Sequence, residues 1–388
     1  MMANAKRLYV YGVMGAALVP LLWGLTSVLR LTVRWVAATV GSRDVVGAEV
    51  ALDELSLALA LVIVAVPVWL IHVWLAQRPL AGSTQQALDE RASPARATYF
   101  FLVLTIAGGI ALLQLYASLQ ELFRAALTDE RTWGVAGAVA ALVVTGAAWL
   151  GHLWWRRADL RAAPARLADD WLTRAYLYGG LFILAVLLAF WIGNAVVVVA
   201  GEIIETSPPW DPWQASFVGP AAGAVGAAVG WSVQWLSGRW LVRADAPLGA
   251  AHRASRTRTG YFLAVVLVAA AVVLGSLVTS GQHVFAEVLG VWRPFDGSRL
   301  AEDVLGPLVL GAPFAIAWWW HWRQGMREAL AWGGRERYAA VRRSGLYVLA
   351  FVGLTGLAIG AAWGIQSLLS LADASHAAAR QTVLWEDG

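Results

Sequence analysis

Long apolar segments alternate with short polar segments along the whole chain. Nine segments are long and apolar enough to predict membrane-spanning helices, at roughly 8–29, 55–75, 98–119, 133–155, 175–199, 214–237, 260–281, 304–323 and 346–370. A helix needs about 20 mostly apolar residues to cross a bilayer. None of the nine segments carries a charge near its centre, where a charge costs about 2.5–3.5 kcal/mol. The pattern predicts an all-α, polytopic membrane bundle of nine transmembrane helices.

The polar segments on the two sides of this predicted bundle differ in charge. The N-terminus and the segments after the second, fourth, sixth and eighth helices hold 21 of the 29 basic residues and 8 of the 25 acidic residues. The other segments hold 8 basic and 17 acidic residues, so the two sides have net charges of +13 and −9. Because Lys and Arg remain cytoplasmic during insertion, we expect the N-terminus inside and the C-terminus outside. We expect the cytoplasmic arginines to set this topology and to contact anionic lipid headgroups, not nucleic acid.

Aromatic residues recur at the ends of the predicted helices. A tyrosine opens each odd-numbered helix and a tryptophan pattern closes each even-numbered helix, at Tyr9, Tyr99, Tyr176 and Tyr261 and at Trp69, Trp149, Trp231 and Trp318. Each two-helix unit returns the chain to the same side of the membrane, so the units are parallel. We expect a single membrane domain, 1–388, with four repeats at approximately 6–78, 96–157, 173–240 and 258–323 and a half-repeat at 343–373.

The openings of these units carry a resemblance to a family. RLYVY from Arg7 and RAYLY from Arg174, the helices that end in tryptophan, and the short arginine-rich linkers resemble an uncharacterised family of bacterial membrane proteins. That family carries a membrane-embedded domain of unknown function, often in tandem, and the resemblance extends over almost the whole chain. It implies a membrane location and no particular activity. Tyr261 and Tyr347 depart from the pattern because they lack a second aromatic residue two positions later.

The stretch WLGHLWWRR, Trp149 to Arg157, places one histidine among three tryptophans where an apolar segment meets two arginines. One interpretation is an interfacial belt, in which the repeated tyrosines and tryptophans lie at the level of the lipid headgroups. The polar side chain within the pattern then bonds a headgroup, a backbone carbonyl or a neighbouring helix. In the four repeats, that position holds His72, His152, Gln234 and His321.

A second interpretation gives these histidines a cofactor. Imidazole is a common axial ligand of haem, so His72, His152 and His321 are candidate ligands of a haem or a chlorin. Gln234 at the equivalent position argues against this interpretation. A third interpretation is a proton relay or a pH sensor, because histidine titrates near neutral pH.

Three carboxylates form a candidate cation site on the opposite side. Glu202, Glu287 and Asp373 each lie 26 residues after the tyrosine that opens their repeat. In a continuous helix that separation is about 39 Å, which exceeds a hydrocarbon core of about 30 Å. The three residues are either solvated helix ends or an acidic vestibule that concentrates cations.

Glycines recur at helical spacing in two of the predicted helices. They are Gly219, Gly223, Gly226 and Gly230 in one helix and Gly356, Gly360 and Gly364 in the other. Small residues at a spacing of four let the backbones of neighbouring membrane helices approach closely. We expect these glycines to lie at contacts between helices.

Composition and the absence of catalytic motifs narrow the function. The 388 residues are 59% hydrophobic and 14% charged, with no cysteine and six histidines. The sequence lacks a phosphate-binding glycine loop, a zinc-protease motif and a serine-hydrolase elbow. We therefore predict a non-enzymatic protein of the bacterial inner (plasma) membrane, without metal or cofactor, that forms a pore or a scaffold. Its expected partners are the bilayer, other membrane proteins or a second copy. The alternative is a haem- or pigment-binding subunit.

Overall fold

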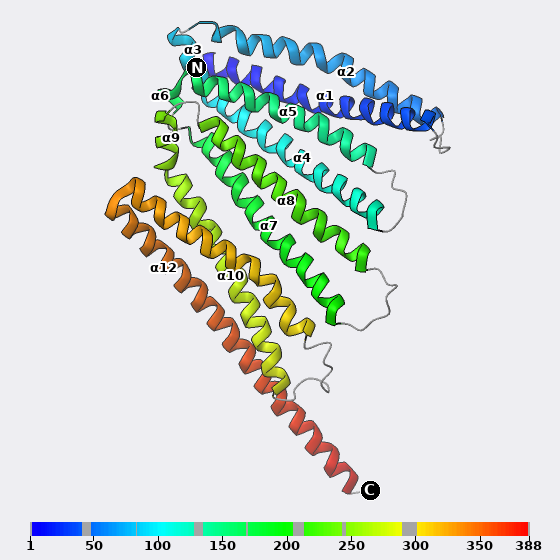
Figure 1. Ribbon diagram of the computed structural model, residues 1–388, viewed down its shortest axis with the longest axis vertical. Helices are drawn as coiled ribbons and strands as arrows, with labels where there is room; N and C mark the ends of the chain where they lie inside the picture. Colours follow the sequence, from blue (N-terminus) through cyan, green and yellow to red (C-terminus); the bar gives the residue numbers. More distant parts are fainter. Residues whose placement is uncertain are drawn as a thin grey trace. The chain divides into compact units, whose positions relative to one another are not determined.

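The computed structural model describes residues 2–40, 48–82, 84–127, 135–167, 170–204, 213–242, 246–288 and 301–386. These described residues form helices and no strand (Figure 1). Eight of the helical segments are long and apolar enough to cross a membrane. The predicted all-helical class and the predicted multi-pass membrane character are confirmed at this level.

Eight long helices and five short helical elements make up the described chain. The long helices are α1 (Met2–Val40), α2 (Ala48–Gln77), α4 (Pro94–Leu127), α5 (Val135–Ala162), α7 (Trp171–Ile204), α8 (Trp213–Val242), α10 (Arg256–Val288) and α12 (Gly306–Glu386). The short elements are η1 (Arg78–Leu80), α3 (Gln85–Arg91), α6 (Pro164–Leu167), α9 (Ala246–Arg253) and the π-helical η2 (Ala301–Leu305).

Helix α8 matches the sixth predicted helix in position but is not among the eight apolar segments. Its sequence is rich in glycine and contains Gln234, and both features lower its mean hydropathy. The prediction that α8 crosses the membrane therefore depends on its position between the other helices and not on its apolarity.

The helices divide into two compact units. The first unit is Met1–Leu184 with Val225–Arg258, and the second is Ala185–Ala224 with Thr259–Gly388. The division passes through α7 and α8, so it does not follow the boundaries of the predicted two-helix repeats. Those boundaries stay a prediction.

In the first unit, α1 packs against α2, α4 and α5. Figure 1 shows α1 beside α2 and α4 beside α5. α1 and α2 lie close together at Gly24, where an added Cβ atom would lie 2.8 Å from the carbonyl oxygen of Ala58. Tyr11, Met14 and Phe100 are among the buried residues of the core that these helices share.

We call α1–α2, α4–α5, α7–α8 and α10 with residues 306–322 of α12 the first to fourth hairpins. A short helix lies before the first long helix of the second, third and fourth hairpins. α3 precedes α4, α6 precedes α7, and α9 precedes α10. Ser93 and Ser255 accept backbone hydrogen bonds from the amides of Arg96 and Arg258, at 3.4 and 3.3 Å. These serines satisfy N–H groups that the first turn of α4 and of α10 would otherwise leave unpaired. The described parts of these linkers thus contain short helices, which carry arginines such as Arg91, Arg166 and Arg253.

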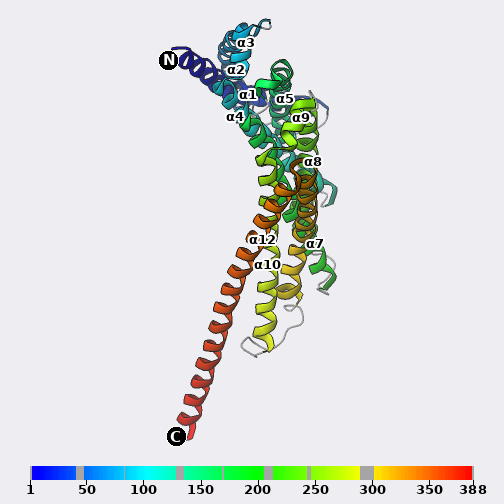
Figure 2. The ribbon, with the colours of Figure 1, turned by 90° about the vertical axis from the view of Figure 1, so that its left-hand side faces the viewer.

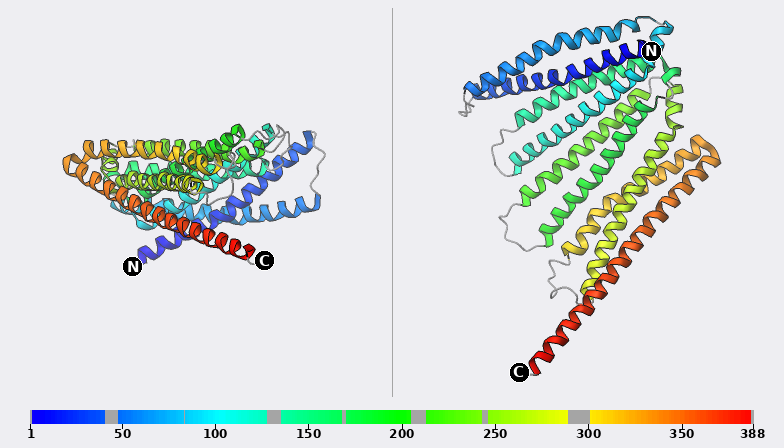
Figure 3. Two further views of the ribbon diagram at one scale, coloured as in Figure 1. Left: turned by 90° about the horizontal axis from the view of Figure 1, so that it is seen from below. Right: turned by 180° about the vertical axis from the view of Figure 1, so that it is seen from behind.

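In the second unit, α12 folds back on itself. A straight helix would separate residues 322 and 345 by about 34 Å, but a Cβ atom on Gly345 would overlap the ring of Trp322. The first arm of α12, through Trp322, and the second arm, from Gly345, therefore lie side by side (Figure 3). Two membrane helices joined by a linker were predicted over this range, and the structure is helical throughout it.

The second arm of α12 also packs against α10. A Cβ atom on Gly356 would overlap the side chain of Leu274, and Figure 2 shows the two helices side by side. The core of this unit is formed by Ala189, Ala269 and Phe314. Gly356 therefore lies at a close helix contact as predicted, whereas an added Cβ atom on Gly360 or Gly364 would have no atom within 4 Å, so the prediction fails at these two positions.

Candidate functional site

The tyrosine that opens a hairpin contacts the histidine near the end of the same hairpin. The hydroxyl of Tyr99 in α4 lies 2.7 Å from Nε2 of His152 in α5. The hydroxyl of Tyr261 in α10 lies 2.9 Å from Nε2 of His321 in the first arm of α12. In the first hairpin, the rings of Tyr9 and His72 have centroids 5.7 Å apart. The sequence repeated both residues of each pair, but their pairing across the hairpin was not predicted.

The other ring nitrogen of each histidine contacts its own helix. Nδ1 of His72, His152 and His321 lies 2.7–2.8 Å from the carbonyl oxygen four residues earlier, on Val68, Ala148 and Ala317. A carbonyl oxygen only accepts hydrogen bonds, so Nδ1 carries the proton and donates. In His152 and His321, Nε2 then has the lone pair, and the tyrosine hydroxyl donates to it.

The third hairpin makes the same contact with an amide. The hydroxyl of Tyr176 donates to Oε1 of Gln234 at 3.1 Å. The Nε2 group of Gln234 donates to the backbone carbonyls of Tyr176 and Leu177, at 3.1 and 3.4 Å. Glutamine and histidine therefore make equivalent hydrogen bonds here. Each accepts a hydrogen bond from the tyrosine hydroxyl and donates one to a backbone carbonyl. Gly180 makes room for the amide, since an added Cβ atom would lie 2.6 Å from Nε2 of Gln234.

The predicted haem or chlorin does not fit two of its three candidate ligands. Axial ligation needs the lone pair of an imidazole nitrogen, and in His152 and His321 that lone pair accepts a tyrosine hydroxyl. The two side chains are also buried, with 3% and 5% of their surface exposed. Among the described residues, no group of three or more His, Cys, Asp or Glu side chains has the arrangement of a metal site.

The tryptophans of the repeated pattern pack between helices. The indole Nε1 of Trp149 donates to the hydroxyl of Tyr176 at 2.6 Å, which joins the second hairpin to the third. Trp69 stacks on Trp155, with ring centroids 6.0 Å apart. The side chains of Tyr99, Tyr176 and Tyr261 are buried, and the interfacial belt stays a prediction. Trp231 and Trp318 are half-buried, and the outward-facing aromatic residues include Tyr9, Trp74, Trp154 and Trp319.

A buried ion pair joins α4 to α5 next to these contacts. Nε and Nη2 of Arg96 lie 2.6 and 3.1 Å from the two carboxylate oxygens of Asp159. Both residues are almost fully buried, with 2% and 3% exposed surface. Two parallel N–H···O bonds give such a pair a fixed geometry. The guanidinium of Arg96 also lies 5.2 Å from the ring centroid of Phe100.

The same arginine continues the network into α1 and α3. Nη1 of Arg96 donates to the hydroxyl of Tyr11 at 3.0 Å, and this hydroxyl donates to Oε1 of Glu90 at 2.9 Å. Nε of Arg7 donates to the other oxygen of Glu90 at 2.7 Å. The network therefore ties four helices together at one end of the first unit.

Arg156, next to the tryptophans of WLGHLWWRR, is also buried. Its guanidinium pairs with Asp170, and its Nε donates to the hydroxyl of Thr173 at 3.0 Å. Only 1% of its surface is exposed. The partners of Arg156 are thus protein side chains, which differs from the predicted contact with lipid headgroups. For the exposed arginines of these linkers, headgroup contact stays a prediction.

A second contact of the Tyr11–Arg96 kind joins α7 to the start of α10. Nη1 of Arg258 lies 3.3 Å from the hydroxyl of Tyr178. In both cases the tyrosine is the second aromatic residue of a Tyr-x-Tyr opening, and the arginine lies three residues before the next repeated tyrosine. Sequence reasoning missed these contacts, although this shared spacing was visible.

The structure describes only one of the three side chains that form the predicted cation vestibule. Glu287 lies in α10 and is partly exposed. Glu202 and Asp373 lie in helices, but their side chains are outside the described set. The acidic vestibule therefore stays a prediction.

Comparison with known families gives one match. A family model described as "Domain of unknown function (DUF5671)" matches residues 7–133. The match begins at the RLYVY opening and ends before α5, so it covers the first hairpin and α4. It agrees with the resemblance to an uncharacterised family over this part of the chain. No curated protein and no solved structure matches the chain.

Proposed function

We propose that the chain is a non-enzymatic scaffold of the membrane, built from helical hairpins that buried hydrogen bonds hold together. The observation that carries this proposal is the bond from Tyr99, Tyr176 and Tyr261 to an acceptor in the same hairpin. A hydrogen bond between membrane helices contributes about 0.6 kcal/mol on average. The bond gives three of the four hairpins the same small but directional stabilisation, which suits a structural element.

The equivalence of histidine and glutamine supports a structural role. A ligand, relay or sensor function depends on the imidazole itself, which Gln234 cannot replace. A hydrogen-bond acceptor is available from either residue. Together with the Tyr11–Arg96 and Tyr178–Arg258 contacts, this supports the proposal that the chain consists of tandem two-helix repeats.

The buried charges of the first unit support a scaffold more than a pore. Arg96, Arg156 and Asp159 are each at most 3% exposed, and each pairs within the protein. Ion channels place rings of charge or carbonyl groups where a permeating ion can reach them. Charges that satisfy one another inside a helix bundle do not serve that purpose.

The proposal includes the membrane in which the protein lies and the orientation of its two termini. The charge difference between the two sides favours an N-terminus inside and a C-terminus outside, in a bacterial inner membrane. Reporter fusions at the two termini test this orientation, because a cytoplasmic fluorescent protein and a periplasmic phosphatase are active on opposite sides.

A flux measurement separates the scaffold from the pore. The purified protein is reconstituted into liposomes that hold an ion-sensitive dye, with protein-free liposomes as the control. A scaffold gives no flux above the control, and the mass of the detergent-extracted complex shows a stoichiometric membrane partner or a second copy. Flux that rises with protein content, and that falls when Glu287→Gln is introduced, would establish a pore and overturn the proposal.

A further inference from the structure

An open groove runs along α1 in the first unit. Its volume is about 900 Å³, and residues of α1, α4 and α5 line it. Most of the lining side chains are apolar, including Leu18, Leu22, Leu102 and Ile106. Tyr99, whose hydroxyl bonds His152, also lines the groove.

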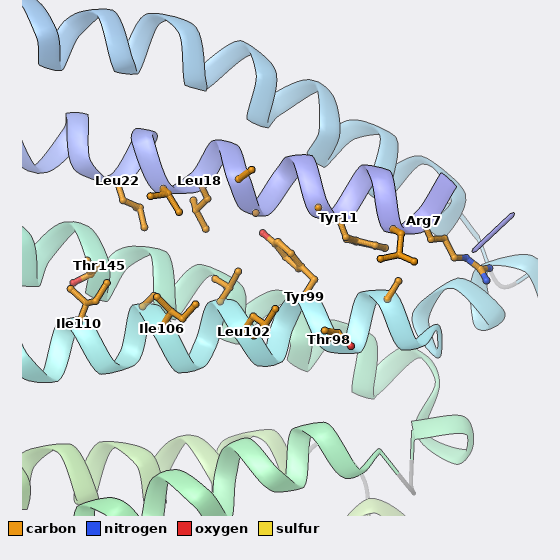
Figure 4. Close-up of a pocket in the computed structure, with 18 of the residues that line it drawn as sticks. Arg7, Tyr11, Leu18, Leu22, Thr98, Tyr99, Leu102, Ile106, Ile110 and Thr145 are labelled. Carbon is orange, nitrogen blue, oxygen red and sulfur yellow. The ribbon is translucent and has the colours of Figure 1, made fainter. Parts of the chain in front are cut away.

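The two ends of the groove differ in chemistry. Figure 4 shows Arg7 and Tyr11 at one end and Leu22, Ile110 and Thr145 at the other. Arg7 is the one charged side chain among the residues that line the groove. Asn4 and the exposed Thr98 add further polar groups to the lining. A ligand that fits this arrangement has an acidic head and a long apolar tail.

Two glycines keep the groove open. Gly12 and Gly15 both line it, and an added Cβ atom on Gly12 would have no atom within 4 Å. From Arg7 to Leu22 the helix rises about 22 Å. One leaflet contributes about half of a hydrocarbon core of about 30 Å, so the groove is long enough for the acyl chains of one leaflet.

Among the described residues, the salt-bridge network that Arg7 joins has an excess of positive charge. Nε of Arg7 bonds Glu90 and one Nη contacts Asn4, which leaves further N–H groups among the five donors of a guanidinium. The connected network contains one more guanidinium than carboxylate, with Arg7, Arg91, Arg96 and Arg156 against Glu90, Asp159 and Asp170. The excess positive charge favours an anionic headgroup.

We propose that this groove is a binding site for an anionic phospholipid, whose acyl chains lie along α1 and α4 and whose phosphate contacts Arg7. A partner helix could fill the apolar part but would need an acidic side chain at the level of Arg7, whereas an anionic phospholipid always carries its phosphate above its acyl chains. A phospholipid matches both ends and is supplied by the membrane around the protein. The site goes beyond the scaffold proposal, since a scaffold does not require a bound lipid.

Native mass spectrometry tests the site directly. The full chain is purified in mild detergent with an equimolar mixture of phosphatidylglycerol and phosphatidylcholine, whose masses distinguish the bound lipid. We expect the wild type to retain phosphatidylglycerol. Gly12→Leu fills the groove and should reduce the retained lipid by about tenfold or more. Arg7→Gln should reduce the preference for phosphatidylglycerol while acyl-chain binding remains.

A matched control is available on α5. Gly151 is exposed, has no atom within 4 Å of an added Cβ atom and does not line the groove. Gly151→Leu should therefore retain lipid like the wild type, and melting temperatures show that all three variants fold. Equal retention by Gly12→Leu, or equal binding of the two lipids by the wild type, would overturn the proposal. So would a lipid-free dimer whose contact surface includes residue 12.

Discussion

The hydroxyl of Tyr99 lies 2.7 Å from Nε2 of His152, while Nδ1 of the same ring lies 2.7 Å from the carbonyl oxygen of Ala148. These two contacts fix the orientation of the ring and the nitrogen that carries the proton. They also explain why a single imidazole lies within WLGHLWWRR. It joins the second helix of a hairpin to the first.

The first prediction concerns the acceptor at position 152. His152→Gln should leave the melting temperature in detergent close to that of the wild type, because Gln234 fills the same role in the third hairpin. His152→Ala removes the acceptor and leaves the buried hydroxyl of Tyr99 unpaired, which should cost about 1–3 kcal/mol. A double-mutant cycle with Tyr99→Phe measures the coupling. Equal losses from the Gln and Ala variants would contradict the prediction.

The second prediction concerns the buried ion pair. Arg96→Ala leaves the carboxylate of Asp159 buried without its partner, which should cost about 3–5 kcal/mol. Arg96→Lys should restore only part of this loss, because an ammonium group cannot form the two parallel bonds. The measurement is thermal unfolding followed by size-exclusion chromatography.

An exposed pair provides the control for that experiment. Arg166 and Asp89 lie 2.5 Å apart, with side chains 43% and 47% exposed. Arg166→Ala should cost about 0–1 kcal/mol, because solvent screens exposed pairs. If both alanine variants lost the same stability, burial would not be the cause of the effect at Arg96.

The third prediction concerns the packing of α1 on α2. Gly24→Ala would bring a Cβ atom within 2.8 Å of the carbonyl oxygen of Ala58, so the helices must separate, at a cost of about 1–3 kcal/mol. Gly12→Ala meets no neighbouring atom and should leave the melting temperature unchanged or raise it. A melting curve for each variant decides, and a stable Gly24→Ala protein would show that α1 and α2 pack less closely than described.

The fourth prediction is spectroscopic. Because Nε2 of His152 and of His321 accepts a tyrosine hydroxyl, we expect the protein purified from its host to show no Soret or chlorin band. Added haem should give no shifted Soret band that depends on either residue. A stoichiometric band that disappears in His152→Ala would show that the imidazole leaves its tyrosine to bind the cofactor.

The apolar segments predicted the long helices because membrane insertion depends on length and apolarity. They did not predict which side chains face one another. A helix that is apolar all round has no distinct buried face, so the repeated Tyr99 and His152 were assigned to a belt instead of to each other. The counts of basic and acidic residues on the two sides also did not predict side-chain contacts. They separate two sides of a membrane, but the pairing of Arg96 with Asp159 depends on helices placed by the fold.

The exchange of His152 for Gln234 at one structural position has a consequence for tracing ancestry. Each of the two residues provides one acceptor and one donor, so they share a hydrogen-bonding class and not an identity. A search that scores identity counts such an exchange as a difference, although the chemistry is unchanged. The family match ends at residue 133, yet a tyrosine–arginine contact of the same kind recurs at Tyr178 and Arg258. A search that scores the hydrogen-bonding class at these few positions would count the exchange of histidine for glutamine as a match.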